Sequence, residues 1–306
     1  MTGRYLPYAF ALLLLATTAQ AHPLQISLHP REDRMPAPWS GEGSAKPAAL
    51  ALLDCLNSLV AGNTARAEKS CSDALAVNPG NHDAYKLRGY AYLTDHRFER
   101  AAGDFEAALR LKPRDDEDRA GYAQSLSGQG RFNEAVGQYR KALALAPAKA
   151  PYWNGLCWAR AGSGRKLDQA LDDCNRALAL QPGAAAALNS RGLVYLRLKQ
   201  YRRAIADYTA SLAAGPLQAS ARFGRGLARL FAGEGAKGAA DIAQARRRDP
   251  DIDGLFVMLD VLPLTCISHP APPLCPNGFP PLKAGPSAYL VAAESPLRST
   301  PVSRRP

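Results

Sequence analysis

Cysteine is the residue type in this sequence with the widest choice of chemistry, because thiols can form disulfides, bind metal ions or react with oxidants. No Cys-x-x-Cys motif is present, and that spacing is typical of redox and zinc-binding cysteines. His269 lies between the last two cysteines, so a metal site there is an alternative to a disulfide. Three possibilities are therefore open for the cysteines: structural disulfides, buried free thiols, and redox or metal chemistry. The cysteines are Cys55, Cys71, Cys157, Cys174, Cys266 and Cys275.

The histidines and carboxylates give no clear sign of catalysis. No two of the five histidines have the helical spacing of metal ligands, and we expect His82 and His96 to be exposed. The acidic run Asp115–Asp118 follows Pro113, where a new helix would begin, and carboxylates there stabilise the helix N-terminus through its dipole. We therefore predict no catalytic residue, no metal site and no cofactor.

Prolines recur at a nearly fixed interval along the chain. This interval indicates which elements position the cysteines, histidines and carboxylates. The separations are 34, 34, 35, 34 and 34 residues for Pro79, Pro113, Pro147, Pro182, Pro216 and Pro250. Proline ends a helix because it lacks the N–H that the next turn requires. A period of this length is typical of helical hairpins stacked in series, so the sequence predicts an all-α solenoid.

The repeated unit resembles the tetratricopeptide repeat over about two thirds of the chain. With each proline counted as residue 32, this family has characteristic residue types at positions 4, 8, 11, 20, 24 and 27, and the second unit matches with Tyr85, Gly89, Tyr92, Ala101, Phe105 and Ala108. The resemblance implies a right-handed superhelix of about six hairpins. The expected units are residues 48–81, 82–115, 116–149, 150–184, 185–218 and 219–250.

Two of these units have cysteines at positions 8 and 24, where other units place a small and an aromatic residue. Facing residues in an antiparallel hairpin have numbers with a nearly constant sum, so Cys55 would face Cys71, and Cys157 would face Cys174. Their separation would suit a disulfide. We predict both bonds, and a third between Cys266 and Cys275.

The first 21 residues have the features of a secretory signal peptide. Arg4 precedes an apolar run, and Ala19-Gln20-Ala21 is a suitable cleavage site. The run is shorter than the roughly 20 residues that cross a bilayer, so we expect cleavage after Ala21 and a periplasmic or secreted protein without a membrane span. Cleavage would make His22 the first residue, and copper binding by His22 with His29 is a minor alternative to the absence of metal.

The regions outside the repeats are expected to differ in whether they form regular structure. Residues 22–47 lack helical periodicity and would form a flexible lead-in, whereas the apolar residues of 251–263 predict a capping helix. Residues 264–306 are rich in proline and are expected to be largely irregular and flexible.

The net charge of +11 is the only feature that suggests nucleic acid as a partner. The basic residues are spread along the helices and the protein is expected to be exported, so we predict no nucleic-acid binding. Attraction to an anionic envelope polymer is an alternative, and it would weaken steeply with salt.

The resemblance implies a concave groove lined by the first helix of each unit. Amide side chains there can hydrogen-bond a peptide backbone, and aromatic side chains can anchor it. The residues at these positions are Lys86, Tyr90, Gln124, Asn154, Trp158, Asn189, Phe223 and Leu227.

We therefore expect a scaffold that binds protein or peptide partners and has no enzymatic activity. An accessory subunit that positions an envelope enzyme or a secretion or assembly machine is an alternative. The first unit has apolar residues on more than one side of its leading helix, so residues 22–47, a second copy of the chain or a partner would cover it.

Overall fold

The computed structural model describes residues 47–215 and 218–262. This part of the chain contains thirteen α-helices and no β-strand, which confirms the predicted all-α class. The helices are α1 (Ala48–Val60), α2 (Thr64–Val77), α3 (His82–Thr94), α4 (Phe98–Leu111), α5 (Asp116–Gly128), α6 (Phe132–Leu145), α7 (Ala150–Ser163), α8 (Leu167–Leu180), α9 (Ala185–Arg197), α10 (Tyr201–Ala214), α11 (Ala219–Phe231), α12 (Gly235–Arg248) and α13 (Ile252–Met258).

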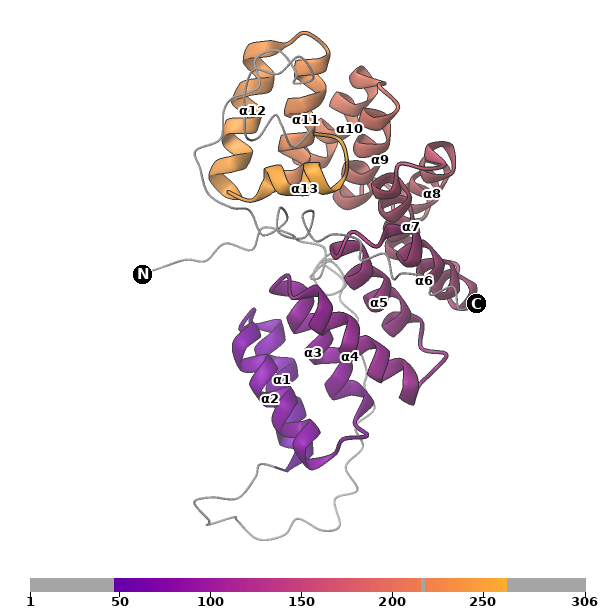
Figure 1. Ribbon diagram of the computed structural model, residues 1–306, viewed down its shortest axis with the longest axis vertical. Coiled ribbons are helices and arrows are strands. Elements are labelled where there is room, and N and C mark those ends of the chain that lie inside the picture. Colours follow the sequence, from indigo (N-terminus) through magenta and orange to yellow (C-terminus); the bar gives the residue numbers. More distant parts are fainter. Residues whose placement is uncertain (1–46, 216–217, 263–306) are drawn as a thin grey trace, which may run out of the picture.

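Helices α1 to α12 pair as six consecutive hairpins, and each hairpin packs against the next. The hairpins follow one another along an arc, from α1 and α2 at one end to α11 and α12 at the other (Figure 1). Polar side chains define several starts: Asn63, Asn81 and Asp115 each accept a hydrogen bond from a backbone N–H in the first turn.

Each hairpin turns through three residues, and in five of the six the central residue has a left-handed backbone. Glycine, which has no Cβ to clash, occupies this position at Gly62, Gly130 and Gly233. His96 and Lys199 adopt the same conformation with φ of 57° and 58°. The remaining turn, between α7 and α8, has two left-handed residues, Gly164 and Lys166.

Aromatic residues on the second helix of a hairpin join neighbouring hairpins. The ring of Phe105 lies against Gly89 of its own hairpin and Gly121 of the next, where an added Cβ would lie 2.4 Å from the ring. Tyr139 packs on Gly155, and Tyr208 packs on both Gly192 and Gly224. An aromatic residue at position 24 therefore requires glycine at position 6 of the following unit.

Cysteines replace this arrangement in the first and fourth hairpins. Cys55 lies opposite Cys71 with a Cα separation of 5.2 Å, and Cys157 lies opposite Cys174 at 5.3 Å. The following units have Leu87 and Ser190 at position 6, because no aromatic ring needs the space of a glycine. Cys266 and Cys275 lie outside the described residues.

A set of ion pairs that the sequence reading missed holds three of the hairpins together. Arg88, Arg191 and Arg225 each form two hydrogen bonds of 2.7–2.9 Å to an aspartate sixteen residues later, namely Asp104, Asp207 and Asp241. Each arginine also donates to a polar side chain of the preceding hairpin: Ser72, Asn175 or Thr209. The signal in the sequence was the recurrence of arginine and aspartate at this constant separation.

Helix α13 covers the last hairpin and also reaches the third. It packs against α11 and α12 on the side that faces the earlier hairpins (Figure 1). Leu255 and Phe256 are buried, and the side chain of Met258 approaches Gly130 in the turn between α5 and α6. The backbone carbonyl of Leu259, just after the helix, accepts a hydrogen bond from Arg197.

Candidate functional site

Two adjacent pockets lie among the first helices of the hairpins, and they contain five of the eight residues predicted for the groove. The first pocket is lined in part by Tyr90, Gln124 and Asn154, and the second by Gln124, Trp158 and Asn189. Gln124, Tyr139 and Gly155 line both pockets, so they form one continuous depression across α5, α6 and α7. Whether a ligand contacts these residues stays a prediction.

The first pocket is rich in tyrosine and amide groups. Tyr90, Tyr139 and Tyr152 contribute to its lining, and burial raises the pKa of all three phenols, so they stay neutral. The Oδ1 atom of Asn154 is buried there and has no hydrogen-bond partner. The lining of this pocket therefore combines three tyrosines with an amide oxygen that has no partner in the protein.

The second pocket is lined by residues from the second hairpin and from α13, which are far apart in the sequence. Gln124, Trp158 and Asn189 line it together with Leu255 and Met258 of α13. Leu93 of α3, His96 of the turn and Phe98 of α4 complete this part of the lining. The Asn189 side chain donates to the Ser220 hydroxyl at 3.2 Å. Helix α13 is thus part of the groove wall in addition to being the cap of the last hairpin.

Phe223 and Leu227 do not lie on an open groove surface, which corrects the sequence-based placement. Both side chains are fully buried, and the Phe223 ring centroid lies 4.6 Å from that of Phe256 on α13. The apolar face of α13 occupies the place that a ligand was expected to take. The sequence positions alone could not show this, because they say nothing about where the capping helix folds.

Lys86 is also less available than expected. Its Nζ atom lies 3.3 Å from carboxylate oxygens of both Asp115 and Glu117, and 3.9 Å from Asp118. Burial by itself would lower the pKa of Lys86, but the three carboxylates outweigh this effect and raise it. The ammonium charge is therefore neutralised within the protein.

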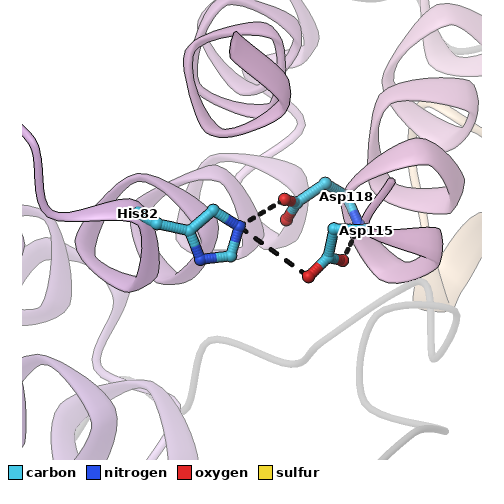
Figure 2. Close-up of side chains that lie close together, drawn as sticks. All are labelled: His82, Asp115 and Asp118. Carbon is cyan, nitrogen blue, oxygen red and sulfur yellow. Dashed lines mark hydrogen bonds and ion pairs between the residues drawn. The ribbon is translucent and has the colours of Figure 1, made fainter. Parts of the chain in front are cut away.

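His82 is buried, contrary to the expectation that it would be exposed. Figure 2 shows its ring pointing from the start of α3 toward Asp118 and Asp115 at the start of α5. Its Nε2 atom lies 2.5 Å from Asp118 Oδ2 and 3.8 Å from Asp115 Oδ2, and Nδ1 lies 2.8 Å from Asp83. The array brings these residues together because it stacks the start of α3 beside the start of α5, one unit further along.

The acidic run has two roles, only one of which was predicted. Asp115 caps α5 by accepting from the backbone N–H of Asp118 at 2.9 Å, in agreement with a helix start. Asp118 is completely buried, and this burial raises the pKa of its carboxyl despite the nearby His82 and Lys86. Three potential ligand atoms, one each from His82, Asp115 and Asp118, lie within 4.8 Å of one another.

Comparison with known proteins agrees with the architecture. The family model described as tetratricopeptide repeat matches residues 58–116, 123–185 and 189–251, which is more than half of the chain. The chain belongs to the tetratricopeptide repeat family. Its hairpins are tetratricopeptide repeats, and the depression lies on the first helices of the repeats, where the resemblance placed the groove.

The similar curated proteins share the repeats over part of their length. DnaJ homolog subfamily C member 7 of Homo sapiens is 29% identical over 173 residues, which cover 51% of this chain and 34% of that protein. The Hsp70-Hsp90 organizing protein of Triticum aestivum is 33% identical over 100 residues, covering 33% of this chain and 17% of that protein. The chain therefore spans about a third or less of the curated relatives named here.

Solved structures show the same fold at low sequence identity. The type IV pilus biogenesis factor PilW has a TM-score of 0.56 and 21% identity, with 68% of this chain and 98% of that chain covered. The PilF structure from Pseudomonas aeruginosa has a TM-score of 0.52 and 20% identity, with 66% and 92% covered. At this level of identity the likeness concerns the fold alone.

None of the helices in residues 47–215 and 218–262 is both long enough and apolar enough to cross a bilayer.

Proposed function

We propose that this tetratricopeptide repeat protein is an exported adaptor that binds an extended segment of a partner protein in its groove, without catalysing a reaction. Tetratricopeptide repeats serve protein–protein interaction in general, and that coarser role follows from family membership. The depression supports the finer proposal because Tyr90, Gln124 and Trp158 are partly exposed within it.

The observation that carries the proposal is the amide of Asn154. This residue is only 5% exposed, it lines the first pocket, and its Oδ1 atom has no hydrogen-bond partner. An unsatisfied buried acceptor costs about 1–3 kcal/mol of stability. A backbone N–H of an extended peptide would satisfy it, with Trp158 as an aromatic anchor in the adjoining pocket.

Export is supported by the sequence of residues 1–21 and by the cysteine geometry. The Cα separations of 5.2 Å and 5.3 Å suit disulfides, and such bonds persist in oxidising compartments. We infer that Cys55 bonds to Cys71 and Cys157 to Cys174. Each bond closes a loop of a size that stabilises by about 3 kcal/mol in the chain-entropy treatment.

The absence of catalysis is inferred from the serines of the second pocket and from the His82 cluster, which consists of His82, Asp115 and Asp118. Among the described residues, the serines that line the second pocket already hydrogen-bond within the protein: Ser127 donates to a backbone carbonyl, and Ser220 accepts from Asn189. The carboxylates of the His82 cluster are held in ion pairs with Lys86. Neither arrangement leaves a nucleophile beside a free general base.

Site-specific photocrosslinking tests the proposal. A photoreactive benzoylphenylalanine replaces Gln124 in the full chain expressed in its own cells, and a matched variant carries it at Lys141, an exposed residue of α6 outside both pockets. We expect a specific adduct from position 124 and none from position 141. Mass spectrometry then identifies the protein captured.

The captured partner allows a quantitative check with purified proteins. Trp158→Ala should weaken its binding by about tenfold or more, as expected for an aromatic anchor. Binding in the groove should change little between low and moderate salt, whereas attraction to an anionic polymer would fall steeply. Equal binding by the wild-type protein and the Trp158→Ala variant would overturn the groove as the binding site.

A further inference from the structure

We propose that His82, Asp115 and Asp118 form a binding site for a divalent transition-metal ion, with Zn²⁺ as the best fit. The three ligand atoms lie within 4.8 Å of one another at the starts of α3 and α5 (Figure 2). One imidazole and two carboxylates form a donor set that suits zinc, with a fourth position open to water.

The first argument is the state of the buried groups. Asp118 is completely buried, and its Oδ1 atom has no hydrogen-bond partner. It lies 3.9 Å from the Lys86 ammonium, which is too far for a hydrogen bond, and a cation bound more closely would satisfy it. This oxygen belongs to the same carboxylate whose other oxygen contacts His82 Nε2 at 2.5 Å.

The second argument is the orientation of His82. Its Nδ1 atom lies 2.8 Å from the Asp83 carboxylate, while Nε2 faces Asp118 and Asp115. Histidine ligands of metals usually donate the other ring N–H to a carboxylate, which fixes the ring and the tautomer. Asp83 supplies this support and holds Nε2 toward Asp118 and Asp115. A metal ion would displace the proton that Nε2 and Asp118 Oδ2 share at 2.5 Å.

The third argument is the local charge. Five carboxylates, those of Asp83 and Asp115–Asp118, face three lysines, Lys86, Lys112 and Lys149. The group therefore has two more acidic than basic side chains. A single divalent cation would balance them, within a protein whose overall charge is +11.

The geometry requires only small movements. Ligand atoms about 2.0–2.1 Å from a tetrahedral metal lie about 3.3 Å from each other. The present separations from His82 Nε2 are 2.5 Å to Asp118 and 3.8 Å to Asp115, on either side of that value. Lys86 Nζ lies 3.3 Å from the same Asp115 oxygen and an equal distance from Glu117, so its ammonium can leave Asp115 and stay paired with Glu117.

Calorimetric titration of the full chain with ZnCl₂ tests the site directly. We expect a binding event in the wild-type protein that is weakened by about tenfold or more in His82→Gln and in Asp118→Asn. His96→Gln is the matched control because His96 lies outside the cluster, and it should leave the affinity unchanged. MgCl₂ should give no comparable event, since Mg²⁺ prefers six oxygen ligands.

Lys86→Met gives the test that loss of folding cannot mimic. This change removes the ammonium that competes for Asp115, so zinc should bind severalfold more tightly. Zinc should also raise the Tm of the wild-type protein and of Lys86→Met, but not that of Asp118→Asn. Unchanged affinity in His82→Gln, or weaker binding in Lys86→Met, would overturn the proposal, and neither result bears on the groove.

Discussion

Individual residues in this protein are matched across the boundary between repeats. Phe105 fills the space above Gly89 and Gly121, and Tyr208 does the same above Gly192 and Gly224. In the two repeats where cysteine replaces the aromatic residue, the next repeat has Leu87 or Ser190 instead of glycine. The choice of one side chain therefore depends on a residue about sixteen positions further along the chain, in the neighbouring repeat.

Gly121→Ala is expected to destabilise the protein by about 1–3 kcal/mol through overpacking. The new Cβ would lie 2.4 Å from the Phe105 ring, which is itself fully buried and cannot move aside freely. Gly137→Ala is the control, because no atom lies within 4 Å of its Cβ position in α6, and it should stabilise by about 0.5–1 kcal/mol. Urea denaturation of the two variants measures the difference, and equal effects would refute the packing argument.

At the scale of helices, the backbone conformation of the turns is as regular from hairpin to hairpin as the helices are. Five hairpins place a left-handed residue at the centre of the turn, and three of them use glycine there. The left-handed conformation costs a residue with a side chain roughly 1–2 kcal/mol because Cβ approaches the following carbonyl oxygen. His96 and Lys199 carry this cost, so these two turns are less favourable than the others.

Lys199→Gly is expected to stabilise the fifth hairpin. Lys199 has φ of 58° and an exposed side chain, so the substitution relieves strain and removes no buried contact. Glycine also loses more backbone entropy on folding, so the net gain should be about 0.5–1 kcal/mol. Thermal unfolding of Lys199→Gly should show a higher Tm. Lys199→Ala, which keeps the Cβ, should show no comparable gain.

At the scale of the whole molecule, α13 changes what kind of surface the array presents. A solenoid of repeats is held together only by contacts between neighbours. Here α13 packs on α11 and α12 and also lines a pocket with residues of α3, α4 and α5. Helix α13 thus joins the sixth hairpin to earlier repeats, and it covers the Phe223 side of the groove.

Phe256→Ala is expected to loosen α13 and expose Phe223. Phe256 is only 2% exposed, and loss of a buried phenylalanine side chain costs about 3–5 kcal/mol where the surroundings cannot collapse. Because α13 has only seven residues, we expect it to detach before the repeats unfold. Hydrogen exchange should accelerate in α13 but not in α5 to α8. Val257→Ala, at a half-buried position of the same helix, should have a much smaller effect.

The candidate groove was only partly predictable from the sequence. Tyr90, Gln124, Asn154, Trp158 and Asn189 line the pockets because their places in the first helix of each repeat follow from the period. Lys86, Phe223 and Leu227 were placed by the same rule, but Lys86 is neutralised by carboxylates and the other two are covered by α13. The rule describes one repeat and its neighbours, and it contains no information on charges or helices that arrive from elsewhere.

The sequence by itself determined the all-α class, the hairpin period and the opposition of Cys55 to Cys71 and of Cys157 to Cys174, because each depends on spacing within one repeat. Only the tertiary structure decided that His82 meets Asp118 across 36 residues and that α13 lies on Phe223. These contacts depend on how the repeats are stacked and on where the chain turns after the last repeat. The stacking and the position of the turn both result from many packing contacts together. No local pattern of residue types predicts them.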